Sequence, residues 1–194
     1  MTLTPSTMLP LGTLVPYFRL TDVVTGKIIS LDDIKGKQAL LVMFICRHCP
    51  YVKHVAKEIA RIGRDYIDKN ISIVAISSND ADSYPEDNPE SLKEMAKELD
   101  LVFPLLYDPT QEVAKAFTAA CTPDFFIFDK DEKLVYRGQL DGSRPGNNIP
   151  VTGKDLRGAI DDVFNHKSVT SEQKPSTGCN IKWKLGNEPT YFKT

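Results

Sequence analysis

The sequence lacks the features that mark membrane-spanning and nucleic-acid-binding proteins. No stretch of its 194 residues has the roughly 18–20 apolar residues that a membrane-spanning helix requires. Its 24 lysines and arginines are balanced by 26 aspartates and glutamates, so no basic excess is available to nucleic acid or to an anionic membrane. Residues 1–10 carry no basic residue and no long apolar run, unlike a secretory signal. We therefore expect a soluble, cytoplasmic protein with no nucleic acid or membrane partner.

Cysteine is also scarce. The chain has four cysteines. A small secreted protein stabilised by disulfide bonds would be shorter and would contain a higher proportion of cysteine. Cys46 and Cys49 form one close pair, and Cys121 and Cys179 stand alone. In a reducing compartment, such a pair is better interpreted as catalytic or metal-binding than as structural.

Apolar residues follow patterns that alternate between strand and helix. The unbroken apolar run at 39–45 predicts a central strand buried on both faces. Apolar residues at spacings of three to five over 51–68 predict an amphipathic helix. The other expected elements are a hairpin within 17–30, strands at 71–77, 103–107, 125–129 and 134–138, and helices at 89–100, 110–117 and 154–164. This order predicts an α/β fold with a mixed sheet, formed by a domain at 1–166, followed by a polar C-terminal tail at 167–194.

Cys46 and Cys49 stand at the junction of the apolar strand and the amphipathic helix. Pro50 suits the first turn of that helix, where an N–H would have no partner. The unpaired N–H groups and the positive dipole of this turn favour a thiolate over a thiol. Arg47 and, when protonated, His48 would stabilise the Cys46 thiolate further. We therefore expect a depressed Cys46 pKa and a relatively oxidising pair.

Two other interpretations of the pair stay open. The cysteines could be buried structural residues, or they could bind a metal together with His48 and His54. The sequence has no second C-x-x-C or H-x-H group, and a closed zinc site usually needs four ligands. We therefore expect no metal and no other cofactor.

The segment CRHCPYVKH at 46–54 carries a family resemblance, together with the stretches at 18–22 and 31–37. It resembles the alkyl hydroperoxide reductase/thiol-specific antioxidant group of the thioredoxin superfamily, in its peroxiredoxin-like branch with a CxxC. The resemblance covers roughly residues 10–165. It implies a thioredoxin-like three-layer α/β/α sandwich with a mixed central sheet, an N-terminal hairpin and an extended C-terminal tail, and a redox function of the antioxidant type.

The resemblance also implies a role for Thr122 and Pro123. In the superfamily a cis-proline lies opposite the CxxC, where it exposes backbone groups that hold an extended substrate beside the sulfurs. Thr122-Pro123, directly before the strand expected at 125–129, matches this position. An ordinary trans turn proline is the alternative, because cis X–Pro bonds are a small minority.

Departures from the peroxiredoxin pattern favour disulfide exchange over peroxide reduction. Aligning the peroxidatic cysteine on Cys49 puts Cys46 where peroxiredoxins have threonine, and the usual distant arginine is replaced by the Thr122-Pro123 turn. The leading hypothesis is a thiol–disulfide oxidoreductase in which Cys46 attacks and Cys49 resolves. Its partners would be a disulfide-bearing protein or a small thiol, and an electron donor that the sequence does not name.

The alternatives are a thiol peroxidase with Cys49 as the peroxidatic residue, and a metal-binding or redox-sensing module. Weak peroxidase activity is compatible with any exposed low-pKa thiolate.

The remaining candidates have auxiliary roles. Leu40 stands where thioredoxins have a buried carboxylate, so His54 or Lys53 becomes the candidate for moving the resolving proton. Cys121 should lie near the pair, as a third redox partner or as a small buried hydrophobe. Cys179 should be exposed in the flexible tail, where it could resolve a disulfide or be an ordinary surface cysteine.

Overall fold

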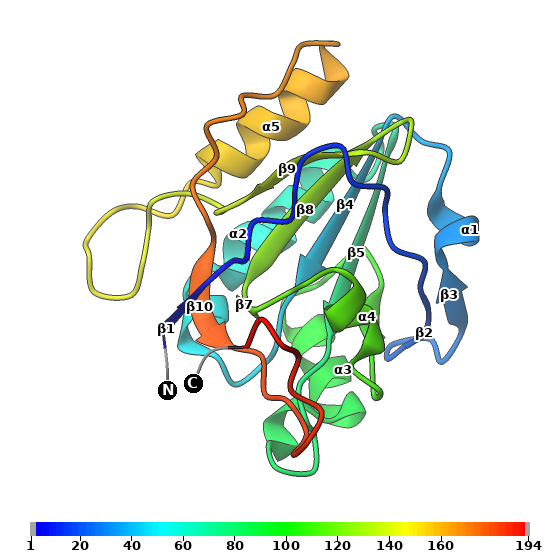
Figure 1. The fold of residues 1–194 in the computed structure, drawn as a ribbon, viewed down its shortest axis with the longest axis vertical. Coiled ribbons are helices and arrows are strands. Elements are labelled where there is room, and N and C mark those ends of the chain that lie inside the picture. Colours follow the sequence, from blue (N-terminus) through cyan, green and yellow to red (C-terminus); the bar gives the residue numbers. More distant parts are fainter. Residues whose placement is uncertain (1–2, 193–194) are drawn as a thin grey trace.

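The computed structural model of the protein describes residues 3–192, and Figure 1 shows its central mixed sheet. The seven strands follow the order β3-β2-β6-β5-β4-β8-β9. Their bounds are β2 Arg19–Asp22, β3 Ile28–Ser30, β4 Ala39–Phe44, β5 Ile71–Ser77, β6 Leu105–Tyr107, β8 Asp124–Asp129 and β9 Leu134–Gly138. Strand β4 is parallel to β5 and antiparallel to β8. The expected mixed α/β sheet is confirmed.

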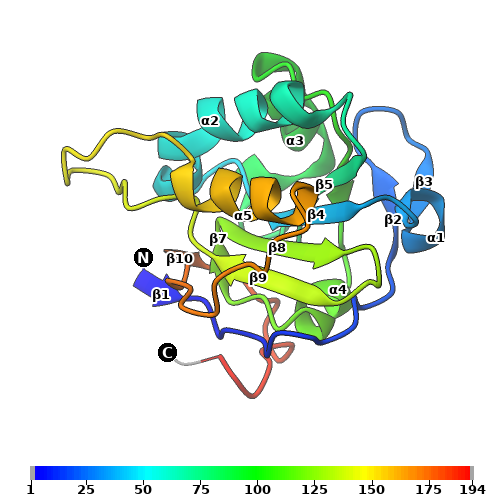
Figure 2. The same cartoon turned by 90° about the horizontal axis from the view of Figure 1, so that it is seen from above.

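Helices cover both faces of this sheet. Figure 2 shows α2, α3 and α5 on one side, and α4 on the other side with the chain's terminal segments. The helices are α1 Leu31–Ile34, α2 Pro50–Tyr66, α3 Pro89–Glu98, α4 Glu112–Ala116 and α5 Lys154–Phe164, with a 3₁₀ turn η1 at Pro85–Asp87. No helix within residues 3–192 combines the length and the apolar character needed to cross a bilayer.

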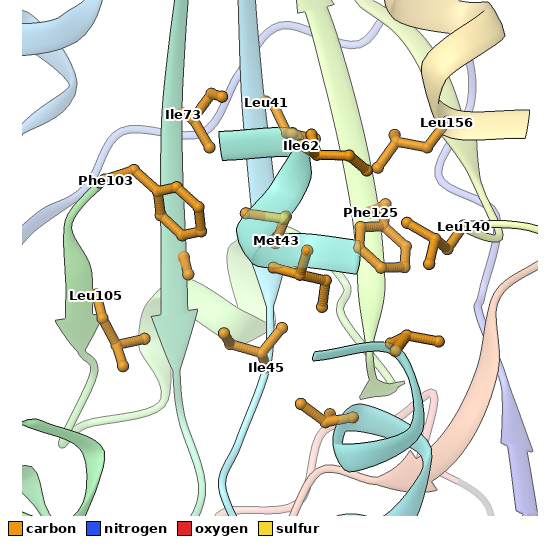
Figure 3. Packing of buried hydrophobic residues seen from close by; sticks show 14 of the residues in the cluster. Leu41, Met43, Ile45, Ile62, Ile73, Phe103, Leu105, Phe125, Leu140 and Leu156 are labelled. Atoms are coloured by element: carbon orange, nitrogen blue, oxygen red, sulfur yellow. The ribbon is translucent and has the colours of Figure 1, made fainter. Parts of the chain in front are cut away.

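Strand β4 is apolar on both faces because it lies between two cores. Leu41 and Met43 pack among side chains of α2 and α5 (Figure 3). Val42 and Phe44 face the opposite core, which includes residues of α4. Side chains alternate along a strand, so burial on both sides explains a run without polar residues. The end of β4 leads directly into the Cys46–Cys49 segment.

A second, three-stranded sheet joins the N-terminal segment and part of the segment after α5 to the short strand that precedes β8. It consists of β1 (Leu3–Pro5), β10 (Thr177–Asn180) and β7 (Cys121–Thr122), with β10 in the middle. Leu3 pairs with Cys179, and Cys179 pairs with Thr122.

The segment after residue 166 is mostly irregular, but it packs against the domain. Ile181 and Trp183 are buried with the core on the α4 side. Cys179 is only 2% exposed, so the prediction of an exposed cysteine in a flexible tail is wrong. The reason is physical: main-chain hydrogen bonds hold β10 between two strands, and these bonds do not require apolar side chains.

Candidate redox site

The two cysteines of the CxxC occupy the turn between β4 and α2. Cys49 is the N-cap residue of α2, and Pro50 begins the helix. Both cysteines are thiols without a disulfide bond, and both are 0% exposed. The sulfurs are therefore at the helix N-terminus, as expected, but they are covered by protein.

Thr122 contacts both sulfurs from β7. Its hydroxyl lies 3.2 Å from Cys46 Sγ, and its carbonyl oxygen accepts a hydrogen bond from the Cys49 thiol at 3.3 Å. The Thr122–Pro123 peptide bond is cis. The structure thus brings the two segments that the resemblance singled out into direct contact.

Hydrogen bonds favour the thiolate at Cys49. When ionised, its sulfur accepts hydrogen bonds from the thiols of Cys179 and Cys46 and from the backbone N–H groups of Val52 and Cys179, and these hold the pKa of Cys49 far below its ordinary value. The pKa of Cys179 is raised because its thiol donates to Cys49 and is buried. Cys49 is the N-cap residue of α2, but the other two thiols lower its pKa more than the helix N-terminus does.

The expected depression of the Cys46 pKa is wrong. Burial raises the pKa of Cys46 well above its ordinary value, and the hydrogen bond to Cys49 and the charge of Asp87 raise it further. Arg47 does not compensate, because its guanidinium is directed to α3. There it pairs with Glu94 at 3.0 Å and Glu98 at 2.9 Å.

Asp87 is a site residue that sequence reasoning missed. It is fully buried at the end of η1. Its carboxylate accepts hydrogen bonds from the backbone N–H of Arg47 at 2.7 Å and from the side-chain amide of Asn79 at 2.7 Å. It also lies 2.5 Å from His48 Nδ1. Burial raises the Asp87 pKa, but the hydrogen bonds from His48 and Asn79 outweigh it and leave the pKa below its usual value.

Asp87 thereby fixes the orientation of His48 beside Cys46. The His48 ring stacks on Tyr84, with 5.3 Å between ring centroids. Its Nε2 atom is buried and has no hydrogen-bond partner among residues 3–192. The Cys46 sulfur, a ring nitrogen of His48 and a carboxylate oxygen of Asp87 all lie within 4.8 Å of one another. A nucleophile, a base and a group that orients the base are arranged in this way in thiol enzymes.

These residue types could also ligate a metal, but the carboxylate of Asp87 is already engaged. It accepts hydrogen bonds from two backbone N–H groups, from Asn79 and from the His48 ring. We therefore interpret Asp87 as the group that orients His48. The alternative metal set from the sequence is not brought together, because His54 Nε2 lies 2.7 Å from Ser143 Oγ in the loop before α5.

The other proposed proton carriers are likewise directed elsewhere. Besides His54, Lys53 lies 3.5 Å from Glu86 in an exposed ion pair. Of the two histidines in the segment 46–54, His48 is therefore the one beside a sulfur. No spacing rule pointed to its partner Asp87, because the partner comes from a polar, proline-containing loop far along the chain.

Cys121 lies next to Thr122 in the sequence but is engaged differently. Its thiol donates to the carbonyl of Pro123 at 3.7 Å, and burial raises its pKa. Its electrostatic neighbours include the fully buried ion pair of Asp124 and Arg137, 3.1 Å apart. This environment favours the interpretation of Cys121 as a small buried hydrophobe.

Comparisons with solved structures place this geometry in a known fold. A crystal structure of an uncharacterized conserved protein from Geobacillus kaustophilus has a TM-score of 0.93 and 56% identity, covering 95% of this chain and 97% of its own. A thioredoxin family thiol:disulfide interchange protein from Chlorobium tepidum TLS has a TM-score of 0.61 at 18% identity, covering 79% of this chain and 97% of its own. The fold is thioredoxin-like.

Curated relatives and a family match complete the comparison. The thiol-disulfide oxidoreductase ResA of Bacillus thuringiensis subsp. konkukian is 29% identical over 64% of this chain and 67% of its own length. A Mycobacterium tuberculosis protein named "Putative peroxiredoxin" is 27% identical over 69% of this chain and 87% of its own. The sequence model of the AhpC/TSA family matches residues 11–137, more than half of the chain. The protein therefore belongs to the AhpC/TSA family, as its resemblance implied.

Proposed function

We propose that this protein is a thiol–disulfide oxidoreductase that exchanges disulfides through Cys46 and Cys49. Oxidoreductase activity in general follows from its relatives, which are named for thiol–disulfide and peroxide chemistry. The observation that carries the finer proposal is the contact of Thr122 with both sulfurs at the N-terminus of α2. Two thiols, one of them strongly acidic, lie against the loop that would hold an extended substrate.

In this proposal Cys46 is the attacking residue and His48 its base. His48 takes the Cys46 proton, and the resulting thiolate attacks a sulfur of the substrate disulfide, so that one substrate thiolate leaves. Cys49, which ionises readily, then attacks Cys46 as a thiolate and releases the second substrate sulfur, which receives the proton held by His48. The substrate disulfide gains two electrons, and the Cys46–Cys49 disulfide is formed.

Single cysteine variants test the proposal. Cys46→Ser should abolish the reduction of a model disulfide, such as insulin, and Cys49→Ser should accumulate a mixed disulfide at Cys46. Cys121→Ser is the matched control, because Cys121 is a buried thiol outside the pair and should leave the rate unchanged. Exchange that persists in folded Cys46→Ser would overturn the assignment.

A thiol peroxidase is the second candidate, favoured by the depressed pKa of Cys49. A stable thiolate is the species that attacks the O–O bond of a peroxide. In this case Cys46→Ser would keep its peroxide turnover, whereas Cys49→Ser would lose it. Rapid peroxide turnover by Cys46→Ser, together with absent disulfide exchange in the wild type, would favour the peroxidase.

We further propose a cytoplasmic location, with a disulfide-bearing protein or a small thiol as partner. The low number of cysteines supports a reducing compartment. Trapping with Cys49→Ser in intact cells, followed by fractionation and mass spectrometry, would identify the partner. Mixed disulfides recovered solely from outside the cytoplasm would contradict this location.

A further inference from the structure

Strand β10 occupies the place beside Thr122 where a substrate would be expected. It pairs antiparallel with β7, with Cys179 opposite Thr122 and Asn180 opposite Cys121. The family resemblance implies that backbone groups at this position hold an extended substrate beside the sulfurs. In this protein, a segment of its own chain is bound to those groups.

The fit of β10 at this position is close. A Cβ atom on Gly178 would lie 2.0 Å from the carbonyl oxygen of Thr122, much nearer than any carbon–oxygen contact allows. Directly before β10, the Ser176 hydroxyl donates to the Pro123 carbonyl at 2.6 Å. The sequence of β10 thus contains the residue that permits direct contact with the redox loop.

Cys179 brings a third thiol to the pair. It is 2% exposed and belongs to the same buried cluster as Cys46 and Cys49. Its partner across the strands is Thr122, whose carbonyl oxygen accepts a hydrogen bond from the Cys49 thiol at 3.3 Å. The strand pairing therefore holds Cys179 beside the pair, and hydrogen bonding with Cys179 is the largest cause of the lowered Cys49 pKa.

We propose that β10 is an internal substrate strand and that Cys179 is a third redox cysteine, which exchanges with the pair by attacking Cys49. The proposal rests on the proposed redox function of Cys46 and Cys49. Once these are joined, the Cys179 sulfur forms a bond to Cys49 as the Cys46–Cys49 bond breaks. The proton of Cys179 passes to Cys46, which leaves as a thiol. The number of disulfides is unchanged, so the step needs no added oxidant or reductant.

The experiment uses the full chain with Cys46→Ser, in which Cys49 and Cys179 remain. Oxidised glutathione should form a mixed disulfide at Cys49, and Cys179 should then expel glutathione to give a Cys49–Cys179 disulfide. Mass spectrometry of the intact chain and of peptides distinguishes the two products. We expect the internal disulfide in Cys46→Ser and a stable glutathione adduct in the double variant Cys46→Ser/Cys179→Ser. Adding Cys121→Ser to Cys46→Ser is the matched control and should leave the internal disulfide in place.

Two results would overturn the inference. One is a stable glutathione adduct on Cys46→Ser, in protein whose circular dichroism matches the wild type. The other is wild-type protein in which redox buffers produce Cys46–Cys49 without any Cys49–Cys179. In both cases disulfide exchange by the wild type would leave the proposed function standing. Failure of the proposed function itself would be recognised separately, as wild-type protein that reduces no disulfide.

Discussion

Substitution of Gly178 by alanine should uncover the buried thiols without changing any of them. The new Cβ would lie 2.0 Å from the Thr122 carbonyl oxygen, and the obstacle is backbone rather than a side-chain tip. Ordinary carbon–oxygen contacts are about 3.3–3.6 Å, so β10 must move away by more than about 1 Å. Such a movement breaks its hydrogen bonds to β7 and separates Cys179 from Cys49.

The size of the effect follows from the bonds that are lost. Strand β10 faces two residues of β7, and Ser176, which directly precedes β10, adds its hydrogen bond to Pro123. Two to three such bonds at about 0.5–1.5 kcal/mol each, with loss of packing, suggest about 2–4 kcal/mol. At about 1.4 kcal/mol per tenfold change, the undocked state of β10 would become about 30- to 700-fold more populated.

The assay is the rate at which iodoacetamide alkylates Cys49 in the native protein, followed by peptide mass spectrometry. Local opening limits the reaction of a buried group, so the rate should rise with the undocked population. Gly142→Ala is the matched control, since a Cβ there meets nothing within 4 Å. A folded Gly178→Ala protein that is alkylated at the wild-type rate would refute the reasoning.

Four further predictions concern charges around the pair. Asp87→Asn should lower the exchange rate and shift its pH profile, because His48 loses its orienting carboxylate; an unchanged profile would exclude this role. The Asp87 pKa is depressed in the folded protein, so this carboxylate stabilises the fold above its unfolded pKa of about 3.9, and the stabilisation is lost as pH falls through the folded value. Urea unfolding at several acidic pH values should therefore show a weaker acid dependence in Asp87→Asn. Arg47→Ala should leave the reduction potential of the pair unchanged and lower stability by about 1 kcal/mol or less; a potential shifted well beyond the error of a glutathione titration would contradict this. Thiolate absorbance in the ultraviolet should persist at neutral pH in Cys46→Ser and disappear in Cys49→Ser, and the reverse pattern would contradict the pKa assignment.

The central elements could be predicted because their sequences are constrained by burial. The apolar run at 39–45 has to be a strand buried on both faces, and the spacing of apolar residues over 51–68 fits a helix with one buried face. Their junction therefore put Cys46 and Cys49 at a helix N-terminus. The position of Thr122 beside them came from the resemblance, since no local pattern joins residues so far apart in sequence.

The parts that could not be predicted depend on long-range backbone pairing and on buried polar contacts. Strand β10 has a polar sequence, and its place is set by main-chain hydrogen bonds to β1 and β7. Asp87 is one of many acidic residues in polar loops, and only the folded chain shows that it is buried against His48. The error over the Cys46 pKa has the same origin, because burial and neighbouring sulfurs outweigh the general effect of a helix dipole.

The position of β10 between β1 and β7 has a consequence for how the protein folds. Leu3 pairs with Cys179, so this contact joins residues near opposite ends of the chain. Closing such a long loop costs entropy that is recovered only after the intervening chain has become compact. The main sheet and α2 can therefore form while the CxxC is still uncovered. During synthesis, the newly made redox pair would be open to small thiols until the last strand arrives, and the mature, covered site would be the final part of the molecule to assemble.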